Sequence, residues 1–348
     1  MCSIMGYPET ASGNLASGGS IGNLIAIVTA RDYKKIEPQI IQESVIYLTS
    51  QVHHCVQKAI RIAGLHRAQT TYIPVDENYK MDVNALQEQI KSDIADGKKP
   101  FLLIGSAGTT DGGAVDPLND LADVAEEFNL WFHVDGPYGG FFMLTGQGKA
   151  IMKGIERSDS LVIDPHKGLF LSYGLGVVLI KNVQAQKDAH QYQANYMQDA
   201  LNDTTELSPA DLSPELTKHF RGLRMWLPLQ IHGLKPFKSA LREKILLTKY
   251  FREALVAIPN IRIVNEPELT IFAYRYENNS FSKQRNNRIN KKLTEEIHKE
   301  GKVFLSSTNI DDEICLRIAI LSFRTHIYEI ELALNEIKTK LESIIKMH

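Results

Sequence analysis

Leu130-Trp131-Phe132-His133-Val134-Asp135 is a mostly apolar run of strand length that ends on a carboxylate, and it decides the fold class. The same pattern recurs in Ser160-Leu161-Val162-Ile163, which is followed directly by Asp164. Short, nearly continuous apolar runs are typical of strands that are buried on both faces of a parallel sheet. Each run therefore predicts a central strand with an acidic residue at its carboxyl end.

Helical and strand-like patterns alternate around these two runs, from the N-terminus to about residue 181. We expect further strands at Val45–Leu48, Thr71–Pro74, Phe101–Gly105 and Gly176–Ile180, and helices at Gly22–Arg31, Val52–Ile62, Asn84–Ile94 and Leu118–Phe128. Strands that alternate with helices predict an α/β domain, in which helices cover both faces of a mostly parallel sheet.

The pattern changes after Lys181. Residues 182–218 are polar and show little periodicity, and a long stretch without a clear element is often a functional lid. We therefore expect a mobile loop at about 184–216. Beyond it we expect helices at Leu223–Ile231, Phe237–Ala257, Asn287–His298 and Tyr328–Ile345, and strands at Ile261–Val264, Leu269–Tyr274 and Glu313–Ile318. These elements predict a smaller α+β domain over residues 236–348, after a large domain over residues 1–235.

The composition is that of an ordinary globular protein. The chain has 348 residues, of which 43% are hydrophobic, and 39 basic against 41 acidic side chains give a net charge of 39 − 41 = −2. This balance argues against a nucleic-acid partner, since such proteins bind largely by neutralising phosphates. Apolar runs are broken within about ten residues, well short of the roughly 20 needed to cross a bilayer. We expect no membrane partner.

The three cysteines, Cys2, Cys55 and Cys315, are widely spaced and odd in number. This arrangement fits neither a disulfide framework nor a zinc site, so no metal site is expected. The segment Met1–Gly6 lacks the basic region and apolar stretch of a signal peptide. We therefore expect a cytoplasmic protein.

Ser17-Gly18-Gly19-Ser20 precedes a predicted helix. Glycines let the backbone approach an anion, and the free N–H groups of a helix start favour phosphate. A plain turn is the alternative interpretation of such a loop. The fingerprints GxGxxG and GxxxxGK[ST] are absent, so neither a nicotinamide cofactor nor a P-loop nucleotide is favoured.

Three more polar features follow predicted strands, and the carboxyl ends of strands form the ligand crevice of open α/β sheets. Asp135 suits the protonated nitrogen of a heterocycle, although an Asp that caps the next turn would look the same. Lys167, in a partly dry crevice, could form a Schiff base, whereas an ordinary surface lysine is the alternative. The hydroxyl- and glycine-rich loop Ser106–Gly113 could supply donors to a ring substituent or phosphate, and a plain surface turn is the alternative.

Together these motifs resemble the group II pyridoxal-phosphate-dependent amino-acid decarboxylases, the family of the aromatic-L-amino-acid, histidine and glutamate decarboxylases. The matching motifs are Ser17–Ser20, Gly108–Thr110, Trp131–Gly140, Asp164–Lys167 and Phe220–Trp226. The resemblance implies the type I, aspartate aminotransferase-like fold with a mostly parallel seven-stranded sheet. It also implies pyridoxal 5′-phosphate as the cofactor, decarboxylation of an L-amino acid, more plausibly an aromatic one, and a homodimer.

The resemblance also implies a role for each matching residue. Lys167 would bind the cofactor covalently, Asp135 would pair with its ring nitrogen, and His53, rather than the adjacent His54, would stack on its ring. Tyr196 matches the loop tyrosine that the family uses to return a proton after CO2 leaves. Further cofactor contacts are implied at Gly19, Ser20, Thr110, Asp164 and His166.

The chain departs from the family pattern in four places, one of which is Lys218-His219, where many members have paired arginines. Family members carry roughly a hundred or more residues, a domain-sized segment, before the Ser-Gly-Gly-Ser loop, whereas here the loop begins at residue 17. Pro137 stands in place of an alanine and Gly168 in place of a common tryptophan. These departures keep two alternatives open, a weakly active or inactive cofactor-binding remnant and another pyridoxal-phosphate reaction on the same fold.

Overall fold

The computed structural model describes residues 1–192 and 207–346. The chain divides into two compact units. The first comprises Met1–Ala107 and Val115–Leu234, and the second comprises the loop Gly108–Ala114 together with the chain from Lys235 onwards. Each unit is described by itself.

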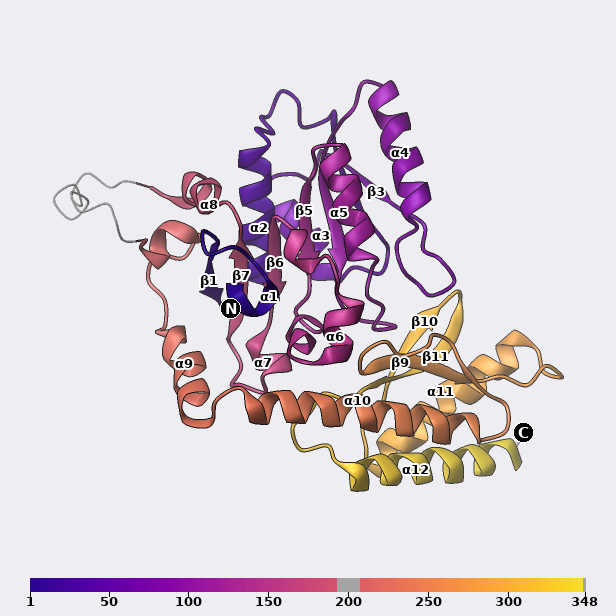
Figure 1. The fold of residues 1–348 in the computed structure, drawn as a ribbon. Coiled ribbons are helices and arrows are strands. Elements are labelled where there is room, and N and C mark those ends of the chain that lie inside the picture. Colours follow the sequence, from indigo (N-terminus) through magenta and orange to yellow (C-terminus); the bar gives the residue numbers. More distant parts are fainter. Residues whose placement is uncertain (193–206, 347–348) are drawn as a thin grey trace. The chain divides into compact units, whose positions relative to one another are not determined.

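A seven-stranded sheet forms the centre of the first unit (Figure 1). Its strands, in spatial order, are β1 (Ser12–Ala16), β7 (Gly176–Ile180), β6 (Ser160–Ile163), β5 (Trp131–Asp135), β4 (Lys99–Ser106), β2 (Ser44–Leu48) and β3 (Gln69–Tyr72). Only β7 runs against the others, pairing antiparallel with both β6 and β1. The expected mostly parallel sheet is confirmed, and the carboxyl ends of β5 and β6 lie at one edge.

Helices lie on both faces of this sheet. The helices of the first unit are α1 (Cys2–Met5), α2 (Gly19–Tyr33), α3 (His54–Ile62), α4 (Val83–Ala95), α5 (Leu118–Glu127), α6 (Gly146–Ile151), α7 (Pro165–Gly168), α8 (Val183–His190) and α9 (Arg221–His232). Short 3₁₀ helices add Gly140–Leu144, Ile155–Arg157 and Pro209–Leu212. The helix α2 packs on α3, α8 and strands β5 to β7, whereas α4 and α5 pack together against β4.

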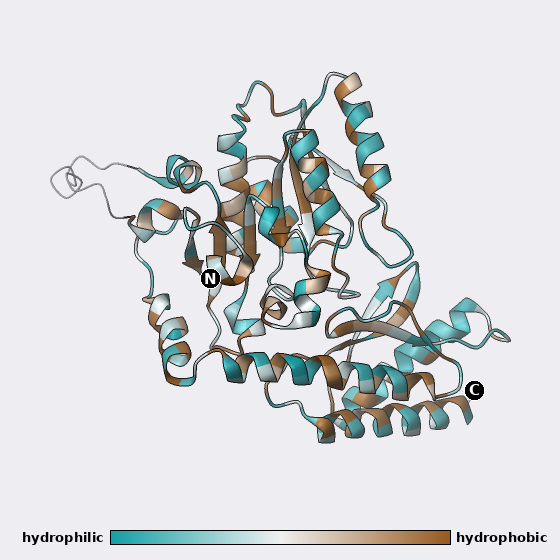
Figure 2. Cartoon of the chain, in the orientation of Figure 1, coloured by the Kyte–Doolittle hydropathy of each residue, from teal (hydrophilic) through white to brown (hydrophobic). Residues whose placement is uncertain are grey.

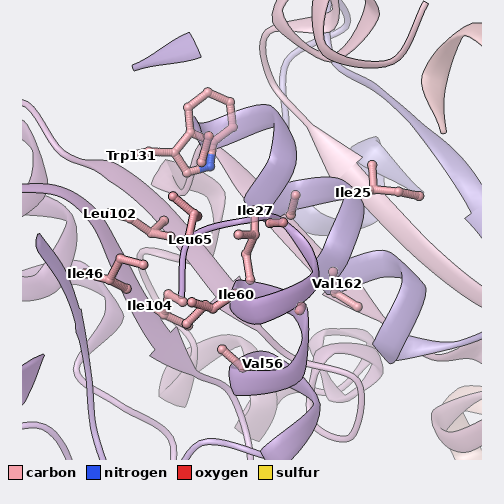
Figure 3. Close-up of a cluster of buried hydrophobic side chains, with 14 of the residues drawn as sticks. Ile25, Ile27, Ile46, Val56, Ile60, Leu65, Leu102, Ile104, Trp131 and Val162 are labelled. Carbon is pink, nitrogen blue, oxygen red and sulfur yellow. The ribbon is translucent and has the colours of Figure 1, made fainter. Parts of the chain in front are cut away.

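Alternation along the strands explains how both faces are filled. Successive side chains of a strand point to opposite faces. Leu102 and Ile104 of β4 therefore join the cluster under α2 and α3 that Figure 3 shows. Gly105 faces the other way, where an added Cβ would lie 3.1 Å from Cδ1 of Leu121 on α5. The strands β2, β4, β6 and β7 are accordingly mostly hydrophobic (Figure 2).

The second unit is built on a four-stranded antiparallel sheet in the order β10 (Ser306–Ile310), β11 (Glu313–Ala319), β9 (Ile271–Tyr276) and β8 (Ile261–Ile263). Its helices are α10 (Lys235–Val256), α11 (Lys283–Glu300) and α12 (Ile327–Lys346). Phe272, Leu293 and Ile337, from β9, α11 and α12, are fully buried in one core cluster. The expected smaller α+β arrangement is confirmed.

Besides several short helices, the sequence patterns did not predict β1, β10 and α8. The strands β1 and β10 contain Ser and Asn, and β1 also Gly, which are poor strand formers, and they form because they pair with β7 and β11. The polar segment 182–218 was expected to lack a clear element, yet it begins with α8. That helix is held by a small residue, Ala185, and by fully buried Gln186, which donates to Leu212 O at 2.8 Å. It therefore shows no apolar stripe in the sequence.

Within the described residues, no helix combines the length and apolarity that crossing a bilayer requires.

Candidate active site

Polar residues of the first unit lie close together where β5 and β6 end and α2 begins. An added Cβ on Gly176, at the start of β7, would lie 2.6 Å from Cα of Gly18 and 2.9 Å from Oδ1 of Asp164. Only glycines let these three segments approach so closely. The glycine loop before α2 and the acidic residue after β6, far apart in the sequence, are therefore adjacent.

Asp135 ends β5 as a buried carboxylate with 6% of its surface exposed. Its Oδ1 accepts a hydrogen bond of 2.9 Å from Nδ2 of Asn23 on α2. Burial raises the pKa of Asp135 to about 6, while Asn23 and the charge of Lys167 oppose this rise. The carboxylate is ionised at neutral pH and suits a cationic partner.

Lys167 lies in α7, one turn after β6, and 41% of its side chain is exposed. Its Nζ is 3.2 Å from Oδ2 of Asp164, which is 2% exposed. Burial raises the pKa of Asp164, and the neighbouring Lys167 and His166 counteract the rise. Oδ1 of Asp164 is buried and has no hydrogen-bond partner in the described part of the chain. The lysine is thus placed by an ion pair yet remains accessible.

His166 precedes Lys167, and a hydrogen bond to the backbone holds the imidazole ring of His166 in place. Nδ1 lies 2.6 Å from the carbonyl oxygen of Leu175, which can only accept, so Nδ1 carries the proton. Nε2 is 3.6 Å from Oδ2 of Asp164. An added Cβ on Gly18 would lie 3.4 Å from Cε1 of this ring. His166 therefore packs beside the glycine loop.

The start of α2 has the features of an anion cradle. Gly18 is its N-cap, its first intrahelical bond runs from Gly22 N to Gly18 O, and the amide of Gly19 donates to the carboxylate of Asp164. The amides before Gly22 thus make no bond within the helix, and Ser20 exposes a hydroxyl beside them. An added Cβ on Gly19 would lie 2.9 Å from Cγ of Pro137. Glycine at position 19 leaves room for that proline.

The departure at Gly168 also has a neighbour that explains it. An added Cβ there would lie 2.6 Å from Cβ of Phe141. A tryptophan at this position would displace the phenylalanine, so this chain fills the space from the other side.

His53 and His54 differ in their surroundings. His53 is half-buried, forms the N-cap of α3 and accepts a hydrogen bond of 3.2 Å at Nδ1 from Cys55 N, whereas His54 is exposed. Cys55 in turn lies 3.4 Å from Nδ2 of Asn23, the same nitrogen that binds Asp135. The start of α3 is therefore near Asp135, which supports His53 as the histidine of this site.

One expected site residue belongs to the second unit, and another is not among the described residues. Thr110 is exposed in the loop Gly108–Ala114 of the second unit, where its carbonyl accepts a hydrogen bond from Nε of Arg317. Tyr196 lies outside the described residues. The expected mobile loop at about 184–216 overlaps this stretch and, at its start, includes most of α8.

Asn23 and Cys55 are close neighbours of Asp135 that sequence reasoning missed. Both come from helices, one and a half turns or less from their N-termini, and their types alone suggest no chemistry. A signal did exist, because His133 interrupts an apolar strand and a buried imidazole requires partners.

The residues of the first unit fit pyridoxal phosphate. The donor set includes a lysine amine for the aldehyde, a buried carboxylate for the pyridinium nitrogen, and a glycine-lined helix start for the phosphate. The orphaned Oδ1 of Asp164 and the cradle at Gly18 and Gly19, which side chains would fill, are the features that a plain surface turn would not need.

Comparison with known proteins agrees with this assignment. The model of a family described as the pyridoxal-dependent decarboxylase conserved domain matches residues 1–277. The chain belongs to this family. An aromatic-L-amino-acid decarboxylase of Bacillus atrophaeus is 36% identical over 344 residues, which make up 98% of this chain and 71% of that protein. Pyridoxal phosphate is therefore the cofactor of this decarboxylase, and amino-acid decarboxylation, a lyase reaction, is its class of chemistry.

Two more relatives bear on the range of the family. A phenylacetaldehyde synthase of Arabidopsis thaliana is 27% identical over 328 residues, 91% of this chain and 67% of that protein. The crystal structure of Oryza sativa TDC with PLP and tryptamine matches with a TM-score of 0.93 at 23% identity, covering 99% of this chain and 74% of that one. At that identity the likeness concerns the fold. This decarboxylase spans 67% to 74% of the length of the three relatives.

Proposed function

We propose that this decarboxylase converts an aromatic L-amino acid to the corresponding amine and CO2. The observation that carries the proposal is the pairing, within one unit, of the buried carboxylate Asp135 with the accessible, ion-paired amine of Lys167. The similarity to the Bacillus enzyme supports the aromatic class of substrate.

Each side chain has a proposed role that matches its surroundings. Lys167 holds the cofactor aldehyde, Asp135 pairs with the ring nitrogen, and His53 stacks on the ring. Asp164 and His166 place the lysine at the end of the glycine loop. The group proposed to bind the cofactor comprises Gly19, Ser20, His53, Thr110, Asp135, Asp164, His166 and Lys167.

Pyridoxal phosphate, when bound, supplies an electron-poor ring that stores the electron pair left by departing CO2. The protein must orient the bond between Cα and the carboxylate and keep the ring nitrogen protonated. Asp135 suits the second task because it is anionic at neutral pH. Tyr196, outside the described residues, is proposed to return a proton to the substrate carbon.

Product analysis tests this function. The holoenzyme is incubated with L-tyrosine, L-tryptophan, L-DOPA, L-glutamate or L-2,4-diaminobutyrate, and CO2 and the amine are quantified. We expect equal amounts of CO2 and amine from at least one aromatic substrate. We expect neither product from L-glutamate or L-2,4-diaminobutyrate. Release of CO2 from glutamate or diaminobutyrate alone would reject the aromatic class. Cofactor binding with no CO2 from any of the five would favour a binding remnant.

Aldehyde formation is the second candidate, because the Arabidopsis synthase is a relative of similar coverage. The tyrosine at position 196 argues against it, since the resemblance associates phenylalanine there with aldehyde formers. Measuring aldehyde and hydrogen peroxide in the same incubations separates the two reactions.

We also propose that the protein is a cytoplasmic homodimer. The helix α9 and its flanks expose a row of large apolar side chains, which on a soluble protein usually marks an interface. Phe220, Trp226 and Ile231 have 79%, 56% and 65% of their surface exposed. Cys2, Cys55 and Cys315 are free, as suits a reducing compartment. Sedimentation of the holoenzyme should give a dimer, and a monomer at micromolar concentration would contradict it.

A further inference from the structure

A row of polar side chains runs through the apolar core beneath α2. Trp131, His133 and Asp135 occupy alternate positions of β5 and therefore point to the same face of the sheet. Ser160 of β6 lies opposite His133 in the strand register, and Asn23 reaches down from α2. None of the five has more than 6% of its surface exposed.

Hydrogen bonds join these five residues into one chain. Trp131 Nε1 lies 2.8 Å from Ser160 Oγ, and Ser160 Oγ lies 2.8 Å from His133 Nδ1. His133 Nε2 lies 2.7 Å from Asn23 Oδ1, and Asn23 Nδ2 lies 2.9 Å from Asp135 Oδ1. The chain thus begins in the core and ends on the carboxylate proposed to face the cofactor ring.

The chemistry of its members fixes the direction of this chain. The indole nitrogen of Trp131 can only donate, so Ser160 Oγ accepts there. An ionised Asp135 can only accept, so the amide N–H of Asn23 donates to it, and Asn23 Oδ1 accepts from His133 Nε2. Burial lowers the pKa of His133 to about 4, so the ring is neutral, and with its single proton on Nε2 its Nδ1 accepts from Ser160. Every donor meets an acceptor.

The chain favours the ionised form of Asp135. A proton on Oδ1 would have to be donated to Asn23, which requires the amide and the imidazole to reverse their roles. Ser160 would then accept from both Trp131 and His133, and its own proton would have no acceptor in the described part of the chain, which is costly. A proton on Oδ2 would leave the hydrogen bond from Asn23 to Oδ1 in place but weaken it, because a carboxylate is the stronger acceptor.

Other groups also face Asp135. Lys167 of α7 favours its ionised form, and Asp164 opposes it. The thiol of Cys55 from α3 is held neutral, because burial and the charge of Asp135 raise its pKa to about 11. Asn23 is the one neighbour that both donates to Asp135 and is itself oriented by the chain behind it.

We propose that Asn23 and His133 are positioning residues, which keep Asp135 ionised and fixed in orientation through the one-directional chain from Trp131. This inference rests on the proposed role of Asp135 as the partner of the ring nitrogen. Neither residue would touch the reacting atoms, and each would act through Asp135.

NMR of the protein without cofactor tests the chain independently of any reaction. In protein labelled with 15N-histidine, His133 should be neutral and carry its proton on Nε2 throughout pH 5.5 to 8. A proton on Nδ1, or a doubly protonated ring at pH 6, would overturn the proposal even if the enzyme decarboxylates amino acids.

The second test titrates Asp135 through its 13C-labelled side-chain carboxyl, assigned with Asp135→Asn. Asn23→Leu removes the direct donor at similar volume and should raise the midpoint by one or more pH units. Ser160→Ala should raise it less, and it serves if Asn23→Leu does not fold. The control Thr29→Val alters another fully buried polar side chain of α2 that does not contact Asp135. Equal midpoints in Asn23→Leu and Thr29→Val would contradict the proposal.

The third test measures the affinity of the variants for pyridoxal phosphate. Asn23→Leu should weaken binding of pyridoxal phosphate roughly ten- to a hundredfold, as expected when a hydrogen bond to a charged group is lost. The same change in an Asp135→Asn background should have little effect, since the carboxylate it serves is gone. An equal loss in both backgrounds would indicate a purely structural role. Absence of cofactor binding in wild type would instead reject the proposed function and leave the NMR result standing.

Discussion

The two ends of the proposed cofactor site are built in opposite ways. At Asp135 the carboxylate is buried and bound by Asn23, which is bound by His133, with Ser160 and Trp131 further along the same chain. At Lys167 the amine is 41% exposed, and its partner Asp164 keeps one oxygen without a hydrogen bond in the described part of the chain. The closed, Asp135 end is buried and the hydrogen bonds of its chain are paired, whereas the open, Lys167 end is partly exposed and keeps a hydrogen-bond acceptor that no described residue uses.

The difference follows from what each end must do. A group that stabilises charge works best when it is fixed before the reaction and needs no reorganisation. A lysine that binds and releases a cofactor must change partners. Neighbours that held its amine in a complete set of hydrogen bonds would oppose that exchange. Substitutions at the two ends should therefore differ in their effects on stability as well as on activity.

The largest effect on activity is expected at the open end. Lys167→Ala should lower decarboxylation by roughly a thousandfold or more, as loss of a covalent catalyst does. Because 41% of the side chain is exposed and its ion pair with Asp164 is open to solvent on the lysine side, the free energy of unfolding without cofactor should change by no more than about 1 kcal/mol. Rates of CO2 release and urea unfolding measure the two. A variant that is inactive because it is unfolded would break the comparison.

Asp135→Ala should have the next largest effect, because it removes the anion from the ring nitrogen. We expect a loss of roughly 10²–10³-fold in kcat, similar to the removal of one preorganised electrostatic contact. Asp135→Glu is the matched control, which keeps the charge and displaces it. If Asp135→Ala retained wild-type kcat with the cofactor bound, Asp135 could not be the ring-nitrogen partner.

The closed end also predicts a dependence of stability on pH. Burial raises the pKa of Asp135 from 3.8 to about 6, so the folded protein without cofactor binds this proton more tightly than the unfolded chain. The resulting stability is present below pH 4 and is lost as the pH rises through 6. At about 1.4 kcal/mol per pKa unit the loss is about 3 kcal/mol.

Asp135→Asn isolates this contribution, since asparagine does not titrate and can still accept from Asn23. Relative to wild type, the variant should gain about 3 kcal/mol in unfolding free energy between pH 4 and pH 7. Urea denaturation at several pH values without cofactor measures the difference. A constant difference across this range would show that the Asp135 end is not buried as described.

The smallest effect concerns the cradle between the two ends. Gly19→Ala places a Cβ 2.9 Å from Cγ of Pro137 and should weaken cofactor binding about tenfold, in line with a small overpacking cost. Pro137→Ala should restore most of the affinity in the double variant. Gly146→Ala, at a glycine with nothing within 4 Å, is the control. No rescue would indicate that the proline and the glycine do not compete for space.

Sequence patterns predicted most of the sheet, because β4, β5, β6 and β7 are apolar runs whose length and flanks leave little ambiguity. They missed β1 and α8, because a polar edge strand and a helix anchored by buried Gln186 owe their form to tertiary partners. Within the site, Asp135 and Lys167 stood out by their position after strands. Asn23 and Ser160 did not, since only the fold brings them to His133.

Reduction of the holoenzyme with borohydride, followed by peptide mapping, tests the central claim most directly. The account predicts that the reduced cofactor is attached to one peptide, the one that contains Lys167. Asp135→Asn should still give the same labelled peptide, at lower cofactor occupancy. Attachment to any other lysine, or none in protein that has bound the cofactor, would contradict the account.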